Sequence, residues 1–410
     1  MTDTATTPLV FNPFDPAFRK DPYPTYRRLR EESPAHYSDL AQTWVLSRYA
    51  DCAALLRHPA ASSDQTKADG WREQVIAQGL DPDEILATQT RPFLFRDPPD
   101  HTRLRGLVNK AFTPRVVESL RPRIESIVRE LLDAAQARGE MEVVNDLAFP
   151  LPVAMICEML GVPAEDVDRF RAWSAVAARS LDPDFVLPQD EIRQREEAFT
   201  AFREYMSALI AERRRRPRED LLSALIAAED QGDKLTEAEL LSTAILLLIA
   251  GHETTVNLIG NGTLALLRHP DQAQRLRDDP SLIRTAVEEL LRYDAPVQLT
   301  ARTALEDIPL PSLTLPKGRT AILLLGAANR DPDQFAHPES VDIAREDNRH
   351  LAFGMGIHFC LGAPLARVEG QVALGDLVRR FPAMHLLDDD PPYKPTFTLR
   401  GLASLRVAVP

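Results

Sequence analysis

The sequence is poor in cysteine and has no long uninterrupted apolar run, and both absences narrow the kinds of protein that it can encode. Three cysteines in 410 residues, Cys52, Cys157 and Cys360, are too few and too scattered for a disulfide framework or a paired-cysteine zinc site. The longest apolar runs, such as residues 244–251, fall short of the roughly 18–20 residues that span a bilayer. The N-terminal residues lack a secretory signal pattern. We therefore expect a reduced, cytoplasmic protein without a membrane anchor.

Basic residues are also in short supply. The chain has 48 lysines and arginines against 61 acidic residues, which gives a net charge of −13. A nucleic-acid-binding protein would show the opposite balance, so we expect no nucleic-acid partner. The composition is otherwise that of a globular protein with a large core, because 44% of the residues are hydrophobic.

The apolar pattern indicates a mainly helical protein. Residues 115 onward repeat apolar positions every three or four residues, most clearly in segments 116–139, 196–216, 236–270 and 281–294. Thr236 followed by Glu239 predicts a capping box at the start of the third segment. Strand-like segments are short and lie at 43–49, 320–326 and 397–410. No repeat or flexible linker divides the chain, so we expect one mainly α-helical unit with small β-sheets.

The third helical segment has a polar interruption at its centre. Residues 250–255 read AGHETT, and apolar residues flank them on all sides. Burying Glu253 without partners is costly, so the position needs a compensating network, a function or a water-filled seam. The glycine and threonines also predict a local kink or a π-bulge in this helix.

Two shorter motifs carry paired charges on single helices. Glu289 and Arg292 lie three residues apart in EELLR, and His101 and Arg105 lie four apart in HTRLR. Taken alone, each pair is typical of a solvated surface, where such pairs contribute little.

Cys360 lies in a glycine-rich loop, FGMGIHFCLG at residues 353–362. Glycine is required where the backbone adopts positive φ or approaches another group closely. The loop therefore predicts a flat or bulky group lying against it, with the sulfur facing that group.

Together these four motifs resemble those of the cytochromes P-450. The loop matches the family's haem-binding signature, Phe-Gly-x-Gly-x-His-x-Cys-x-Gly, at every fixed position, and the motifs occur in the family's order. The sequences around these motifs are most similar to those of soluble actinobacterial members that tailor macrolides and related natural products. The resemblance implies the cytochrome P-450 fold, a helical bundle around a buried haem with small β-sheets. It implies one domain over residues 1–410, with a small β-rich N-terminal part and a larger helical haem-binding part.

The resemblance also implies a cofactor, haem b (iron protoporphyrin IX), with the Cys360 thiolate as axial iron ligand. Backbone N–H groups of the loop would temper the thiolate charge, and Phe353 would pack on the thiolate side. The further haem contacts that it implies are His101, Arg105, Arg302, His358, Phe353, Gly354, Ala250 and Gly251. The histidines and arginines among them match the family's propionate partners.

The same resemblance implies two catalytic residues. Thr254 would hydrogen-bond dioxygen, and Glu253 would supply protons through waters. Glu289 and Arg292 would form a buried triad with Arg345 that stiffens the core on the haem side. Val341 stands where the family usually has phenylalanine, which puts the local aromatic packing in doubt.

Family comparison suggests apolar substrate contacts and a lid. The contacts are Leu94, Phe95, Val297, Leu299 and Phe397, although each also fits an ordinary core position. Their apolar character favours a large hydrophobic substrate. Residues 166–196 are expected to form the lid over the haem pocket.

The leading hypothesis for function is a monooxygenase that inserts one oxygen atom of O₂ into a hydrophobic natural product, by hydroxylation or epoxidation. The substrate would resemble a macrolide, a steroid or a terpenoid. A Cys–His hydrolase or transferase using Cys360 and His358 is a different class, but the sequence shows no oxyanion-hole motif for it. A haem-thiolate sensor or a peroxide-using enzyme fits less well, because both Glu253 and Thr254 are present.

Electrons are expected from NAD(P)H through separate proteins, a reductase and a ferredoxin. Too little sequence follows Cys360 for a flavin reductase domain, and the Gly354-x-Gly356 pair lacks a third glycine in the dinucleotide register. An acidic ferredoxin needs a local basic patch on this acidic protein. The candidate cations are Arg103, Lys110, Arg115 and Arg367, unless they are simply solvated or pair within the chain. We expect a monomer.

Overall fold

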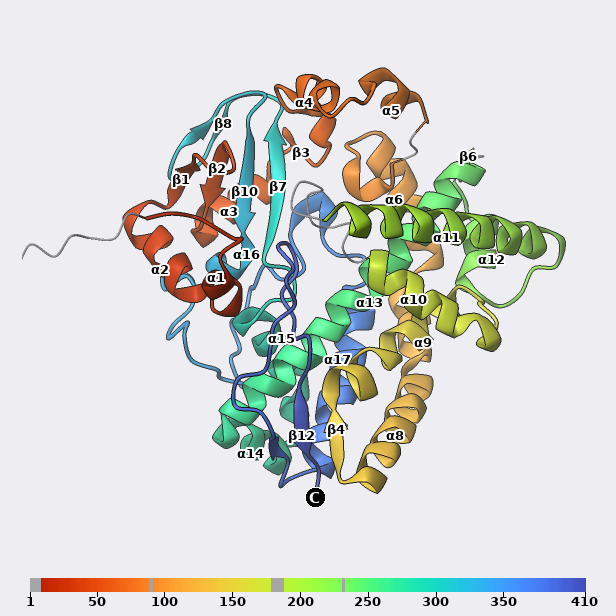
Figure 1. The fold of residues 1–410 in the computed structure, drawn as a ribbon, viewed down its shortest axis with the longest axis vertical. Coiled ribbons are helices and arrows are strands. Elements are labelled where there is room, and N and C mark those ends of the chain that lie inside the picture. Colours follow the sequence, from red (N-terminus) through yellow and green to blue (C-terminus); the bar gives the residue numbers. More distant parts are fainter. Residues whose placement is uncertain (1–8, 89–90, 178–187, 231–232) are drawn as a thin grey trace, which may run out of the picture.

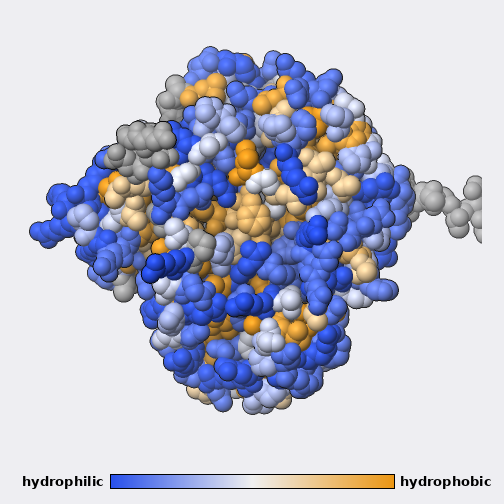
Figure 2. Space-filling model, turned by 180° about the vertical axis from the view of Figure 1, so that it is seen from behind, coloured by the Kyte–Doolittle hydropathy of each residue, from blue (hydrophilic) through white to orange (hydrophobic). Residues whose placement is uncertain are grey.

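The computed structural model describes residues 9–88, 91–177, 188–230 and 233–410. Most helices gather around the long helix α13 (Glu237–Arg268), and the largest sheet lies to one side with the N-terminal helices (Figure 1). The opposite view shows a mostly hydrophilic surface with apolar areas near its centre (Figure 2). The mainly α-helical class expected from the sequence is confirmed.

Helix α13 is the core of the helical part. It begins at the predicted capping box, in which Thr236 Oγ1 accepts a hydrogen bond from the N–H of Glu239 and Glu239 Oε2 accepts one from Thr236 N–H. By length and composition this helix could cross a membrane, but 67% of its most apolar window is buried inside the fold. Such burial is the pattern of a core helix.

The predicted π-bulge in α13 is wrong, and the kink stays a prediction. The helix is continuous α-helix through residues 250–255, and a π-helical turn lies instead at Val144–Ala148. The Thr254 hydroxyl donates to the carbonyl of Ala250 at 2.9 Å, so its polar atom is satisfied without a break in the helix.

The remaining helices surround α13 or cover the sheet. The expected helix over 116–139 divides at Leu120, which separates α7 from α8. The helical bounds are α1 (Pro16–Lys20), α2 (Tyr23–Glu32), α3 (Tyr49–Arg57), α4 (Trp71–Ala77), α5 (Pro82–Thr88), α6 (Asp100–Ala111), α7 (Pro114–Ser119), α8 (Arg121–Arg138), α9 (Pro150–Met159), α10 (Val167–Ala177), α11 (Gln189–Arg215), α12 (Leu221–Ala227), α14 (Pro270–Asp278), α15 (Ile283–Tyr293), α16 (Leu325–Ala328) and α17 (Ala363–Arg380).

The largest sheet has the order β1-β2-β10-β7-β3. Its β10 runs parallel to β2 and antiparallel to β7, with Ile322 opposite Val45 and Ala301. The bounds of its strands are β1 (Ala35–Ser38), β2 (Thr43–Leu46), β10 (Thr320–Leu324), β7 (Leu299–Ala304) and β3 (Ala61–Ser62). The strands expected near residues 45 and 322 are thereby confirmed.

The smaller sheets lie elsewhere in the chain. Strands β11 (His385–Leu386), β12 (Arg406–Ala408) and β4 (Glu140–Glu142) form a three-stranded sheet, and β5 (Glu229–Asp230) pairs with β6 (Asp233–Lys234), as does β8 (Ile308–Pro309) with β9 (Thr314–Leu315). The C-terminal strand expected over 397–410 is mostly irregular. Only β12 forms there, since the preceding residues make single bridges such as Val297 with Leu399.

The hydrophobic core follows this division between helices and sheet. One large cluster joins the helices, and two smaller clusters lie between the main sheet and the N-terminal helices. That these parts make a single domain stays a prediction.

Candidate functional site

The loop that precedes α17 presents Cys360. Two of its glycines, Gly354 and Gly356, have φ of +68° and +72°, which favours glycine at both positions. A Cβ on Gly356 would lie 2.4 Å from the carbonyl oxygen of Leu56, so no larger residue fits there. The N–H of Cys360 donates to the carbonyl of Phe353 at 2.9 Å and closes the loop.

Cys360 is an exposed residue, although protein atoms surround its thiol. The residue is exposed, while Cys52 and Cys157 are buried. Desolvation raises the pKa of the Cys360 thiol, and backbone N–H groups of Gly362 and Ala363 and the charges of Arg105 and Arg367 oppose that rise. These donors are suited to a sulfur that carries negative charge.

Phe353 is the first residue of this loop, and a charged network lies against its ring. The Arg367 guanidinium lies 4.6 Å from the centre of the Phe353 ring and donates two hydrogen bonds, of 2.6 and 2.8 Å, to Glu288. His350 adds a third contact to Glu288 at 3.1 Å. Burial raises the pKa of Glu288, but hydrogen bonds from Arg367 and His350 outweigh it and bring the value to about 2.

Four basic side chains from three parts of the chain meet beside the cysteine loop. His101 and Arg105 come from α6, Arg302 from β7 and His358 from the short helix Gly356–His358. The rings of His101 and His358 lie 4.2 Å apart, and Arg105 donates to the carbonyl oxygen of Phe359, next to Cys360. The structure therefore brings together the four predicted propionate partners.

This basic cluster has hydrogen-bonding groups that a bound anion could use. Burial and the neighbouring charges lower the pKa of His358 to about 3, and burial lowers that of Arg302 to about 10. Both ring nitrogens of His101 and Nδ1 of His358 are buried without a hydrogen-bond partner among the described residues. Two arginines beside two histidines that burial keeps neutral, with ring nitrogens that have no partner, fit a group carrying carboxylates. The cluster and Cys360 thus fit the haem that the sequence predicts.

The hydrolase alternative finds little support in this geometry. His358 Nε2 lies 3.1 Å from the hydroxyl of Ser63, and no hydrogen bond joins His358 to Cys360 in the described part of the chain. An imidazole with a pKa of about 3 is also a weak base for a thiol.

One stretch of α13 is open although the helix is otherwise mostly buried. Ala250 is exposed, and Gly251 and Thr254 are partly exposed. The nearest atom to a Cβ built on Gly251 lies 3.7 Å away, on Ile156, so small residues here leave space rather than avoid a clash. Thr254, the residue predicted to bond dioxygen, therefore lies at an open region of the helix, whereas Glu253 is buried.

Glu253 is buried on the same helix, and its partner was not found from the sequence. The side chain of Lys394 donates to Glu253 Oε1 at 2.6 Å and to Asn257 Oδ1 at 3.3 Å. His252 Nε2 lies 3.7 Å from Glu253 Oε2. Lys394 lies 141 residues from Glu253 in an irregular C-terminal segment without a motif, so the sequence offers no signal for this pair.

Glu289 and Arg292 form a fully buried ion pair rather than a surface one. Arg292 donates to both Glu289 oxygens at 2.8 Å, and Arg345 Nε donates to Oε2 at 3.0 Å. The predicted triad is therefore assembled. The ring of Phe335 lies 5.4 Å from the Arg292 guanidinium and provides an aromatic contact, while Val341 packs into the main core.

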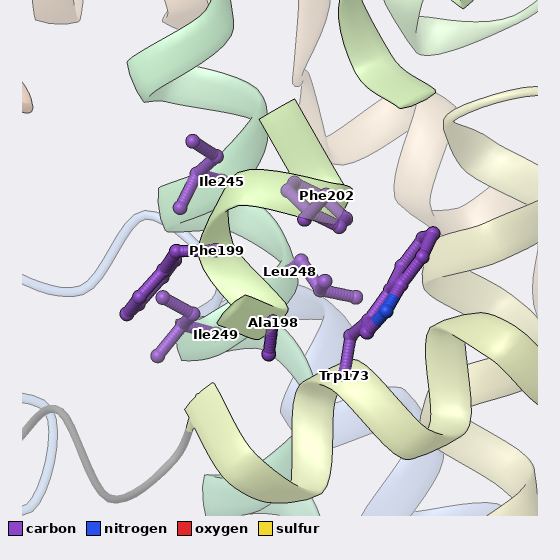
Figure 3. A pocket seen from close by; sticks show the side chains of 7 residues that line it. All are labelled: Trp173, Ala198, Phe199, Phe202, Ile245, Leu248 and Ile249. Carbon is purple, nitrogen blue, oxygen red and sulfur yellow. The ribbon is translucent and has the colours of Figure 1, made fainter. Parts of the chain in front are cut away.

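An apolar pocket lies between α10, α11 and α13 (Figure 3). Its lining residues are Trp173, Ala198, Phe199, Phe202, Ile245, Leu248 and Ile249. Ile245 and Ile249 lie one turn apart on α13 and directly precede Ala250, a spacing that the sequence reasoning overlooked. The predicted lid, residues 166–196, includes α10 and the start of α11, while residues 178–187 lie outside the described residues.

The predicted substrate contacts do not line this pocket. Leu94 and Phe95 lie in the short helix Phe93–Phe95, and Val297 and Leu299 belong to the clusters around the main sheet. Phe397 stacks on Phe14 with ring centres 5.9 Å apart. Leu299 and Phe397 line a second pocket together, while Leu94, Phe95 and Val297 line neither of the two pockets.

The basic patch predicted for an electron donor is partly used inside the chain. Arg103 pairs with Glu239, and Arg367 pairs with Glu288. Lys110 and Arg115 are exposed.

Comparison with known proteins gives a consistent result over nearly the whole chain. The model of the Cytochrome P450 family matches residues 81–405. The chain is 40% identical over 410 residues to the polyketide biosynthesis cytochrome P450 PksS of Bacillus subtilis, covering 98% of this chain and 99% of that protein. It is 43% identical over 402 residues to the vitamin D(3) 25-hydroxylase of Pseudonocardia autotrophica, covering 97% and 96%. The ligand-free crystal structure of Mycobacterium smegmatis CYP164A2 matches with a TM-score of 0.87 and 48% identity, over 97% of this chain and 98% of that one.

Proposed function

Since this chain belongs to the cytochrome P450 family and is a monooxygenase, we propose that it oxidises a large hydrophobic natural product of the macrolide, steroid or terpenoid type. The observation that carries the proposal is the exposed residue Cys360 beside four basic side chains, of which the two histidines have three buried ring nitrogens without a hydrogen-bond partner in the described part of the chain. Hydroxylation or epoxidation is the expected outcome.

The cofactor that we propose is haem b. Cys360 would bind its iron, and His101, Arg105, Arg302 and His358 would hold its carboxylates. Phe353 and Gly354 would shape the thiolate side, and Ala250 and Gly251 would leave room on the opposite side. When bound, the haem supplies the reductive activation of O₂ and the transfer of one oxygen atom.

The residues of this chain would control protons and orientation. Thr254 keeps its hydroxyl at the open stretch of α13, where it would donate a hydrogen bond toward O₂. Glu253 would pass protons from solvent toward that hydroxyl. Because Thr254 already bonds Ala250, its hydroxyl has a fixed rest position from which it can turn.

The pocket of Figure 3, with an empty volume of about 200 Å³, would receive an apolar part of the substrate and would have to widen for a large one. Aromatic and aliphatic residues from three helices line it, and α10 and α11 would act as its cover. The names of two relatives point the same way, because one acts in polyketide biosynthesis and the other on vitamin D(3). Leu94, Phe95, Val297, Leu299 and Phe397 stay candidates for contacts farther from this pocket.

The remaining parts of the proposal concern the rigidity of the core and the supply of electrons to the enzyme. Glu289, Arg292 and Arg345 would stiffen the core behind the haem. A separate ferredoxin, reduced by NAD(P)H through its reductase, would deliver electrons near Lys110 and Arg115. We expect the enzyme to work as a cytoplasmic monomer.

Two measurements on the purified enzyme test this function. Titration with macrolides, steroids and terpenoids should shift the ferric spectrum from low spin to high spin when a compound displaces water from iron. Turnover of a shifting compound under ¹⁸O₂, with NADH, ferredoxin and reductase, should place one ¹⁸O atom in the product. A product that takes its oxygen from water would contradict the proposal.

A further inference from the structure

The ion pair of Glu253 and Lys394 joins the buried middle of α13 to the molecular surface. The Glu253 side chain is 6% exposed and that of Lys394 is 21% exposed, and their charged atoms lie 2.6 Å apart. Lys394 also contacts Asn257, one turn along the helix. The lysine therefore has its charged end at the buried acid while part of its side chain reaches solvent.

A second pocket of the protein lies on the outer side of this pair. It is partly open and is lined by two helices of the N-terminal part and by the loop around Lys394; Phe18, Tyr26, Gln298, Lys394, Phe397 and Gly401 are among its walls. We call it the N-terminal pocket. It shares no lining residue with the apolar pocket of Figure 3. Lys394 is thus both a wall of the N-terminal pocket and the partner of Glu253.

Unused polar atoms gather where the N-terminal pocket meets α13. His252 Nε2 and Asn257 Nδ2 are buried and have no hydrogen-bond partner within the described residues. The backbone approaches closely here, since a Cβ on Gly401 would lie 1.8 Å from Asn257 Oδ1. Asn257 Nδ2 is a donor, whereas His252 Nε2 is an acceptor because the ring donates from Nδ1 to the carbonyl of Leu248. Buried polar atoms of this kind are usually satisfied by water.

We propose that the N-terminal pocket is the proton inlet of the enzyme and that Lys394 is the positioning residue that holds Glu253 at its inner end. This inference rests on the proposed role of Glu253. Reduction of O₂ to one inserted oxygen atom and one water consumes two electrons and two protons. The electrons come from the external donor, and the protons come from solvent water through the pocket to the Glu253 carboxylate.

The ion pair explains how a buried carboxylate is kept ready for this task. An isolated carboxylate at this depth would take up a proton rather than stay charged. The Lys394 ammonium compensates that cost at Oε1 and leaves Oε2 without a close donor. The other groups that face the carboxylate are His252, on the same helix, and Asn257, and burial lowers the pKa of His252 so that it adds little positive charge.

The test compares four variants as haem-loaded enzymes. Lys394→Met removes the charge, Lys394→Gln keeps a polar end, Lys394→Arg keeps the charge, and Glu253→Gln removes the acid. Lys20→Met is the matched control, because Lys20 pairs with Asp390 on the surface with side chains 62% and 66% exposed. For each, product per electron pair and the solvent deuterium isotope effect are measured.

Lys394→Met and Lys394→Gln should lower the product per electron pair by roughly tenfold and raise the solvent isotope effect. Lys394→Arg should stay within about twofold of wild type, because it keeps a hydrogen-bonded cation in place. Lys20→Met should not differ from wild type.

A readout that does not need turnover is the infrared spectrum of the resting ferric enzyme. Wild type should already show a protonated-carboxyl band from Glu369. Lys394→Met should add a second such band, which disappears in the Lys394→Met/Glu253→Gln double variant. If Glu253→Gln is uncoupled but Lys394→Met and Lys394→Gln keep normal coupling and show no new band, the proton inlet is overturned. The proposed function would still stand in that case. Normal coupling in Glu253→Gln would overturn the role of Glu253 itself, and with it this inference.

Discussion

Glu289 and Glu253 are both buried glutamates on helices, yet their surroundings differ in how completely they are bonded. The Glu289 side chain is 0% exposed and accepts hydrogen bonds from Arg292, Arg345 and Asn348, and from the N–H of Asp342. Glu253 has one close cation, Lys394, at a single oxygen. The first carboxylate is saturated, and the second has an oxygen left over.

This difference distinguishes a carboxylate that stabilises the fold from one that can transfer protons. A saturated buried network resists any change of charge, because every donor and acceptor already has its partner. A carboxylate with one free oxygen can take up a proton and pass it on. Changes at Glu289 should therefore reduce stability, and changes around Glu253 should reduce coupling of electrons to product.

The largest effect is expected from breaking the saturated network. Glu289→Ala and Arg292→Ala each strand a buried charge, which typically costs about 3–5 kcal/mol of a total stability of roughly 5–15 kcal/mol. Both variants should lose haem or fail to fold, as judged by haem content and urea unfolding. Arg28→Ala, which removes an exposed pair with Glu32, is the control and should leave both measures unchanged. Stable, haem-loaded Glu289→Ala protein would contradict the comparison.

A third buried glutamate, Glu369, extends the comparison, because it forms no ion pair with a basic side chain within the described residues. Glu369 on α17 is 1% exposed, neither of its oxygens makes a full hydrogen bond within the described residues, and the Thr255 hydroxyl offsets its burial only in part. Burial raises its pKa from 4.5 to about 8. The folded chain then holds a proton that the unfolded chain has released, so the free energy of unfolding should fall as the pH rises between these two values.

Glu369→Gln should remove this pH dependence. Wild type should lose roughly 1 kcal/mol of stability per pH unit from this group between about pH 4.5 and 8, and the variant should not. Urea unfolding at pH 5.5 and 8.5 measures the difference. Equal slopes in the two proteins would mean that Glu369 is ionised in the fold.

A smaller effect on stability, but a clear one on chemistry, is expected at Thr254. Thr254→Ala should lower product per electron pair by roughly tenfold and release peroxide, because the hydroxyl that guides protons is gone. Substrate affinity, read from the spin-state titration, should change little. Thr254→Ser keeps the hydroxyl and should retain most of the coupling; equal loss in both variants would point to packing instead.

The smallest effect concerns the electron donor. Arg115→Glu should slow reduction by an acidic ferredoxin a few-fold at low salt, and the difference should vanish at high salt. Arg103 and Arg367 are poor test positions because reversing them also breaks their ion pairs with Glu239 and Glu288. An Arg115→Glu variant with wild-type rates at every ionic strength would remove this residue from the docking surface.

The features that could be predicted from the sequence are those whose residues lie close together along the chain. The capping box at Thr236 and the helical class follow from neighbouring residues, and the loop of Cys360 carries its glycines within ten positions. The triad needed the resemblance to a family, since Arg345 is distant in sequence. The expected π-bulge failed because a glycine and threonines in mid-helix are also compatible with regular α-helix, in which the Thr254 hydroxyl donates to the Ala250 carbonyl.

Other features could not be reached from the sequence because they depend on chain segments that meet only after folding. Lys394 belongs to no sequence motif, and only its contact with Glu253 indicates its role. The internal pairing of Arg103 and Arg367 likewise needs the positions of Glu239 and Glu288. Ile245 and Ile249 gave a usable helical spacing, but only the position of α11 shows that they line a pocket.

The most direct test of the account is the ferrous–carbonyl spectrum of the enzyme and two cysteine variants. Wild type and Cys157→Ala, which removes a buried thiol, should both show the strongly red-shifted Soret band of thiolate-bound haem. Cys360→Ala should lose that band. A red-shifted band that survives in Cys360→Ala, or purified wild-type protein without haem, would contradict the assignment of Cys360 as the iron ligand.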